Sequence, residues 1–130
     1  MKELIQHNAE EINRLQECVH ETFKSRDKNE HNRREWEKAC KEFHDNYDRL
    51  AFPGGLKGAY ERILAGDPVA MEAAVCFLEA RPYFFRSGYM FKDILRKANK
   101  APLSKDQQER LEAVRKKLDE YRKHRNELKA

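Results

Sequence analysis

Apolar residues recur every three or four positions through long stretches of this sequence, and residues that break helices are rare. The spacing is clearest within residues 30–51, where the recurring residues are Trp36, Cys40, Phe43, Tyr47 and Leu50. Such intervals place the side chains on one narrow face of a helix, a pattern typical of a helix that packs against a single partner helix. Only five glycines and four prolines occur in 130 residues, and they fall in short clusters. The sequence therefore predicts an all-α protein.

A second amphipathic helix is predicted over residues 2–24, in which Ile5, Ile12 and Val19 lie seven positions apart. Residues 25–32, between the two helices, are polar throughout and contain neither glycine nor proline. They could form the turn of an antiparallel hairpin or the middle of one continuous helix, which would imply a homodimer through residues 1–50. We expect the hairpin, because a wholly polar turn of helix has nothing to pack against inside a compact domain.

The segment from Gly66 to Asn99 is the most apolar part of the chain and predicts two short helices. Asp67 can cap a helix that begins at Pro68, because proline lacks an N–H that would be unbonded there and its fixed φ suits a helix. Pro82 should end this helix near residue 80, since the residue before a proline is pushed out of the α region.

An aromatic corner is expected to join these two helices. The consecutive rings of residues 83–85 cannot all point the same way, so some must enter the core beneath the turn. Ser87 is predicted to cap the second helix, which covers roughly residues 89–98 and is closed by Asn99.

Two further helices complete the expected fold, one short over residues 56–65 and one long over residues 105–128. Ser104 and Gln107 have the spacing of a capping box at the start of the long helix. Its apolar seam consists of Leu111, Val114, Leu118 and Tyr121, with Leu128 beyond. Arg125 takes the seam position between Tyr121 and Leu128, so we expect the end of this helix to fray into solvent.

The predicted architecture is a single helical domain over residues 1–130 with about six helices. An N-terminal helical hairpin would cover residues 1–51, and a helical core would cover residues 56–128. The three short middle helices, with their Gly/Pro connections, are expected to stack in the manner of an α-solenoid. The long last helix is basic.

Charge and cysteine content favour a cytoplasmic protein. The formal net charge is +4, with both signs interspersed along the chain. Three cysteines without a CxxC motif suggest reduced thiols and not a disulfide framework. The N-terminal residues lack the apolar stretch of a signal peptide, and no apolar run approaches the length of a membrane span. We therefore expect a soluble protein of the cytoplasm.

The sequence predicts no catalytic, metal or cofactor site, and hence no enzyme. The common nucleophile, phosphate-binding and zinc motifs are missing from the sequence. Cys40, His44 and Asp48 lie at intervals of four, along one strip of a helix, and each can bind a metal. One strip supplies at most two well-placed ligands, however, and Cys40 is better assigned to the helical seam.

The aromatic corner is the leading candidate for a binding surface, and its candidate residues are Arg81, Tyr83, Phe84, Phe85, Arg86 and Tyr89. Tyr, Phe and Arg are enriched at protein interfaces, so rings left outside the core would form a contact surface. The alternative is that all the rings are buried. We expect a small helical protein that binds another protein, as an adaptor, an inhibitor or an immunity-type factor.

Nucleic-acid binding through the last helix is the alternative function. Arg115, Arg122 and Lys129 lie seven positions apart and form one row beside the seam, which could follow a line of phosphates. Carboxylates on the same helix lower the local positive potential, so we place this function second.

Overall fold

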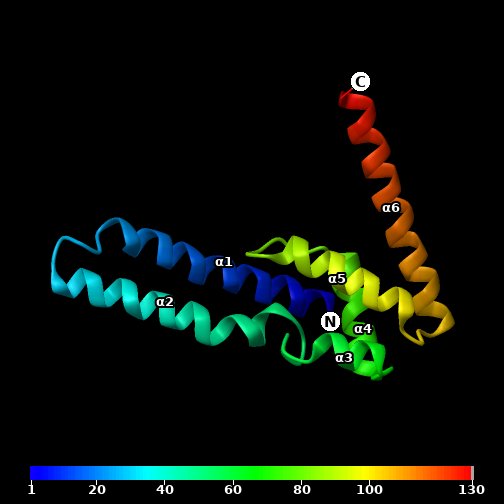
Figure 1. Cartoon of the computed structure of the whole chain (residues 1–130), viewed down its shortest axis with the longest axis horizontal. Coiled ribbons are helices and arrows are strands. Elements are labelled where there is room, and N and C mark those ends of the chain that lie inside the picture. The colour runs from blue at the N-terminus through cyan, green and yellow to red at the C-terminus, as the bar shows by residue number, and fades with distance from the viewer. Residues whose placement is uncertain (130) are drawn as a thin grey trace.

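The structure is a computed structural model that describes residues 1–129, and this range contains six helices and no strand (Figure 1). The helices are α1 (Lys2–Lys24), α2 (Glu30–Ala51), α3 (Ala59–Leu64), α4 (Pro68–Ala80), α5 (Ser87–Lys100) and α6 (Lys105–Lys129). The all-α prediction is thus confirmed.

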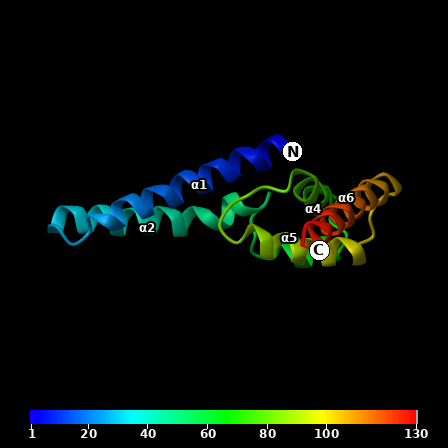
Figure 2. The same cartoon turned by 90° about the horizontal axis from the view of Figure 1, so that it is seen from above.

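Helices α1 and α2 form an antiparallel hairpin, so the continuous-helix alternative is wrong. The hairpin projects as an arm from the other four helices in both views (Figures 1 and 2). Asn29 ends the turn by capping α2, because its side-chain oxygen accepts the backbone N–H of Asn32 at 2.8 Å. Near the tip, the ring of Phe23 meets that of Trp36 edge to face, with centroids 6.1 Å apart.

Helix α4 is the centre of the core and contacts α1, α3, α5 and α6. As predicted, it starts at Pro68, and the Asp67 side chain accepts the Ala70 N–H at 2.9 Å. Its residues from Ala70 to Leu78 are buried, except for Glu72. A helix that is apolar on nearly all sides must be surrounded by other elements, and α4 is enclosed by four helices. Helices α3 and α5 pack against α4 and against each other.

Two predicted helix starts differ from the structure. Helix α3 begins at Ala59, because the Asp48 carboxylate accepts the Lys57 N–H at 2.8 Å and holds the preceding residues in a turn. Helix α5 begins at Ser87, and Ser87 does not cap it; the hydroxyl accepts the Phe84 N–H at 3.0 Å instead.

The end of α5 was also predicted wrongly, because Asn99 lies inside the helix and Lys100 is its last residue. Ala101 follows in an extended conformation and takes the chain out of the helix.

Helix α6 begins with the predicted capping box. The Ser104 N–H donates to Gln107 Oε1 at 3.0 Å, and the Gln107 N–H donates to Ser104 Oγ at 3.1 Å. The helix leaves the other helices after its first turns (Figure 1) and continues to Lys129. None of the helices in residues 1–129 is both long and apolar enough to cross a membrane.

A polar network joins α6 to α4 beside the core. The Arg110 guanidinium donates to the Glu79 carboxylate at 2.7 Å and to the Glu72 carboxylate at 3.0 Å. Cys76 Sγ lies 3.1 Å from Glu72 Oε2, and burial raises the pKa of this thiol. Gln107 adds a hydrogen bond to Glu72 at 3.1 Å, so α6 is tied to α4 by several charged contacts.

Candidate binding groove

The aromatic corner, defined here as residues 81–89, is held in place by side chains of the arm. Asn13 Nδ2 of α1 donates to the carbonyl oxygen of Tyr83 at 2.9 Å. The Tyr47 hydroxyl of α2 donates to the carbonyl oxygen of Phe85 at 2.6 Å. Because both helices bind its backbone, the corner is a fixed element and not a loose loop.

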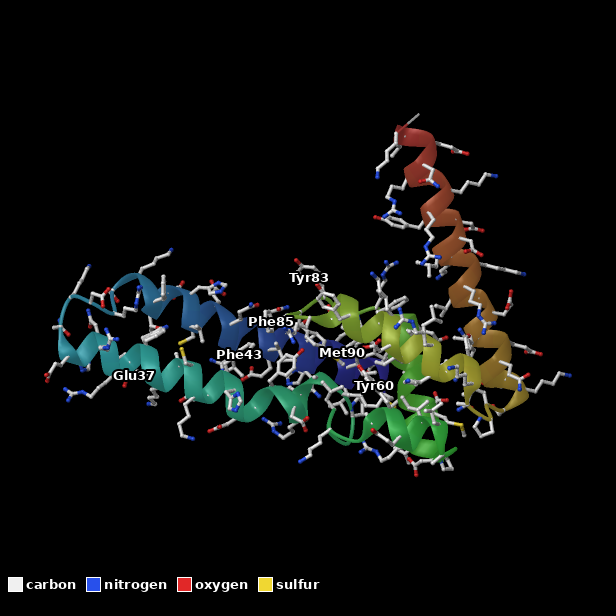
Figure 3. All side chains as sticks on the ribbon, viewed as in Figure 1. Glu37, Phe43, Tyr60, Tyr83, Phe85 and Met90 are labelled. Atoms are coloured by element: carbon white, nitrogen blue, oxygen red, sulfur yellow. The ribbon has the colours of Figure 1, made fainter. Side chains whose placement is uncertain are left out.

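Some rings of the corner are exposed and others are buried, so the alternative in which all are buried is wrong. Tyr83 is 88% exposed, Tyr89 72% and Phe85 45%. Phe84 is buried and supports the corner from beneath. Figure 3 shows Tyr83 at the outer edge of the corner and Phe85 beside Phe43 of α2; the centroids of the Phe43 and Phe85 rings are 5.9 Å apart.

A cavity of about 910 Å³ lies between the corner, α5 and α6. We call it the corner groove. Its aliphatic lining is Pro82 of the corner, Leu95 of α5 and Leu118 of α6. Its cationic residues are Arg81, Arg86, Lys92, Arg122 and Arg125, and the described residues that line it include no Asp or Glu. The groove therefore combines apolar surface with positive charge that no lining carboxylate offsets.

Arginine side chains also lie against aromatic rings of the groove. The Arg81 guanidinium lies 5.1 Å from the centre of the Phe91 ring on α5 and 5.5 Å from that of Tyr121 on α6. The Arg86 guanidinium lies 5.7 Å from the centre of the Phe85 ring. At such distances the ring faces attract the guanidinium charges.

Two arginines of the corner have left-handed backbone conformations. Arg81 ends α4 with φ of 45°, and Arg86 precedes α5 with φ of 67°. This conformation costs a residue with a side chain about 1–2 kcal/mol. Strain of this kind persists only where surrounding contacts fix the backbone, and it is often found at functional sites.

The strain at Arg86 can be measured with a matched pair of substitutions. Both Arg86→Gly and Arg86→Ala remove the guanidinium, but only glycine relieves the left-handed backbone. We expect the Arg86→Gly variant to exceed the Arg86→Ala variant in free energy of unfolding by about 1 kcal/mol. Urea denaturation followed by circular dichroism gives the difference. A higher stability of the alanine variant would contradict the assigned conformation.

All six residues predicted for the corner surface line the groove. Five of them are exposed, and Phe84 is the exception. Sequence reasoning missed Lys92, Tyr121 and Arg125 as lining residues, because they come from α5 and α6. One signal was present, since Arg125 interrupts the apolar seam of α6 at a position that now faces the groove.

The row of cations proposed for nucleic acid is divided in the structure. Arg115 forms an ion pair with Glu112 at 3.0 Å and a hydrogen bond with the side chain of Asn99. Arg122 lines the groove, whereas Lys129 is the last residue of α6. Only Arg122 of this row belongs to the candidate site.

Two of the three candidate metal ligands on α2 take structural roles. Cys40 is half-buried in the hairpin, and Asp48 holds the turn before α3. Within residues 1–129, no three His, Cys, Asp or Glu side chains lie close enough together to hold a metal ion.

Comparison with models of protein families, with curated proteins and with solved structures gave no match.

Proposed function

We propose that this protein is a non-catalytic binding protein that captures another protein at the corner groove, as an adaptor, an inhibitor or an immunity-type factor. The observation that carries the proposal is a set of exposed rings and unopposed cations on a fixed backbone. Tyr and Arg contribute most to binding energy at protein interfaces, and here both are presented together.

The fixed backbone supports the same proposal. Association costs free energy when loops must be ordered, and a surface that is already ordered avoids part of this cost. The hydrogen bonds from Asn13 and Tyr47 provide that order before any partner arrives.

The proposed location is the cytoplasm. Cys18, Cys40 and Cys76 are free thiols, as is usual for proteins of a reducing compartment.

Removing exposed groups of the corner should abolish capture without unfolding the protein. We expect the double variant Tyr83→Ala/Arg86→Ala to lose the proteins that the wild-type chain retains from a lysate of its host. Quantitative mass spectrometry of the captured proteins measures this loss. Because both side chains are exposed, the free energy of unfolding should change by only about 0.5–1 kcal/mol.

The control places equivalent changes on the arm. In Phe23→Ala/Arg34→Ala, one exposed ring and one exposed arginine are removed far from the groove. This variant should retain the same proteins as the wild type. If the corner variant also retains all of them, the proposed function is wrong.

Single-stranded nucleic acid is the second candidate. Exposed tyrosines beside arginines, as at Tyr83 and Tyr89, are the groups on which bases stack in such complexes. This function requires binding that weakens steeply with salt.

A further inference from the structure

We propose that the occupant of the corner groove is an acidic amphipathic helix of the partner protein, seated between α5 and the distal part of α6. The inference rests on the proposed function and specifies the chemistry of the partner. Three features of the groove lead to it: an uncovered seam on α6, apolar residues on the facing wall of α5, and unpaired cations.

The apolar seam of α6 continues beyond its packing partners inside the molecule. Leu111 and Val114 are buried against the core, Leu118 is half-buried, and Tyr121 is 54% exposed. The spacing of these four residues is regular, so they lie on one face of the helix. The face that packs on the core therefore extends uncovered into the groove. A seam with this spacing is matched in shape by another helix.

The wall of the groove that faces α6 also suits a helical occupant. Phe91 and Leu95 of α5 line the groove and are separated by one turn of helix. The volume of about 910 Å³ is similar to that of about two turns of an α-helix with a diameter of about 10 Å. Apolar side chains of the occupant, spaced one turn apart, would contact Leu95 on α5 and Leu118 on α6.

The charge of the groove determines the charge of the occupant. Within residues 1–129, none of the cations Arg81, Arg86, Lys92, Arg122 and Arg125 pairs with a carboxylate. They lie on the corner, on α5 and on α6, and they line the same groove as Leu95 and Leu118. An amphipathic helix with carboxylates on both sides of its apolar face would place one set opposite the cations of the corner and α5. The other set would lie opposite the cations of α6.

Two other occupants fit the groove less well than an acidic helix. A second copy of α6 would bring its own Arg122 and Arg125 into the groove, where like charges repel. A nucleic-acid strand would satisfy the cations but would leave Leu95 and Leu118 against polar groups. One face of the Tyr121 ring is already covered by Arg81, which reduces its use for stacking.

Four fluorescein-labelled probes test the inference by fluorescence anisotropy against the full chain. The first is a designed helical peptide of 18 residues with leucines on one face and glutamates elsewhere. The second has the same composition in scrambled order, the third carries lysine in place of glutamate, and the fourth is a thymidine oligonucleotide. We expect saturable binding of the first probe only.

Matched charge reversals identify the site. Arg122→Glu/Arg125→Glu should weaken binding of the acidic helix by at least about tenfold. Lys116→Glu/Lys117→Glu makes the same change in net charge on α6 outside the groove, and binding should stay within about threefold of the wild type. Circular dichroism confirms that both variants keep their helix content.

Several results would overturn the inference. If both charge reversals weaken binding of the acidic helix equally, the peptide is attracted by the net charge of the protein and not by a defined site. If the scrambled peptide binds as tightly as the amphipathic one, the occupant does not have to be a helix. Binding of the oligonucleotide that is lost in Arg122→Glu/Arg125→Glu would assign the groove to nucleic acid. If no probe binds while Tyr83→Ala/Arg86→Ala still loses captured proteins, the acidic helix is wrong and the proposed function stands.

Discussion

Replacing Phe77 by alanine is expected to reduce the free energy of unfolding by about 3–5 kcal/mol. Phe77 lies on α4 and is fully buried. Its ring centroid is 6.1 Å from that of Phe52 and 6.3 Å from that of Phe84, so the substitution leaves a cavity bordered by two other rings. Urea denaturation followed by circular dichroism at 222 nm measures the loss.

Phe85→Ala is the matched control, because it makes the same substitution at a half-exposed position of the corner. We expect it to cost less than about 1.5 kcal/mol, since less surface is removed from the core. Similar losses for the two variants would contradict the central position of α4. Because Phe84 supports the corner and packs on Phe77, the Phe77→Ala variant should also bind less well at the groove.

The elements that sequence predicted well are those fixed by neighbouring residues. Asp67 and Pro68 define the start of α4, and the Ser104–Gln107 capping box defines the start of α6, because a cap needs only residues three positions apart. The hairpin followed from the polarity of residues 25–32, a local property as well.

The elements that were predicted incorrectly depend on distant contacts. Lys57 belongs to a turn because Asp48 of α2 binds its N–H, and no local pattern contains that information. Ser87 has the composition of a cap, but its hydroxyl binds the corner backbone instead. Local propensity is weak where tertiary contacts compete with it.

The same distinction between local patterns and distant contacts explains which parts of the candidate site could be predicted from sequence. The corner was identified because consecutive rings cannot all be buried on one side. The groove requires α6 to lie opposite the corner, so the contributions of Tyr121 and Arg125 emerged only from the fold.

Arg110→Ala is expected to lower the free energy of unfolding by about 1–3 kcal/mol near neutral pH, because hydrogen bonds between charged groups are lost at a partly buried site. Arg96→Ala is the control, since Arg96 forms an ion pair with Asp93 at 3.3 Å on the surface. Exposed pairs contribute little, and we expect a loss below about 0.5 kcal/mol. Equal losses would show that the Arg110 network does not tie α6 to α4.

The pH dependence of stability distinguishes this network from packing alone. Hydrogen bonds from Arg110 hold the pKa of Glu79 below its ordinary value. Burial raises the pKa of Glu72, but hydrogen bonds from Gln107, Cys76 and Arg110 outweigh it and leave the pKa lowered. A carboxylate whose pKa is lowered by folding stabilises the protein above its unfolded pKa, and this contribution is lost as the pH falls through the folded pKa.

The wild-type protein should therefore lose stability as the pH falls below the ordinary glutamate value of 4.5. In the Arg110→Ala variant the two carboxylates lose their main charged partner, and their pKa values should rise. The wild type should then exceed the variant in stability by less at pH 3 than at pH 7, as measured by urea denaturation at both pH values. A difference that is the same at the two pH values would mean that Arg110 acts through packing of its side chain and not through its charge, since only the charge is linked to protonation of Glu72 and Glu79.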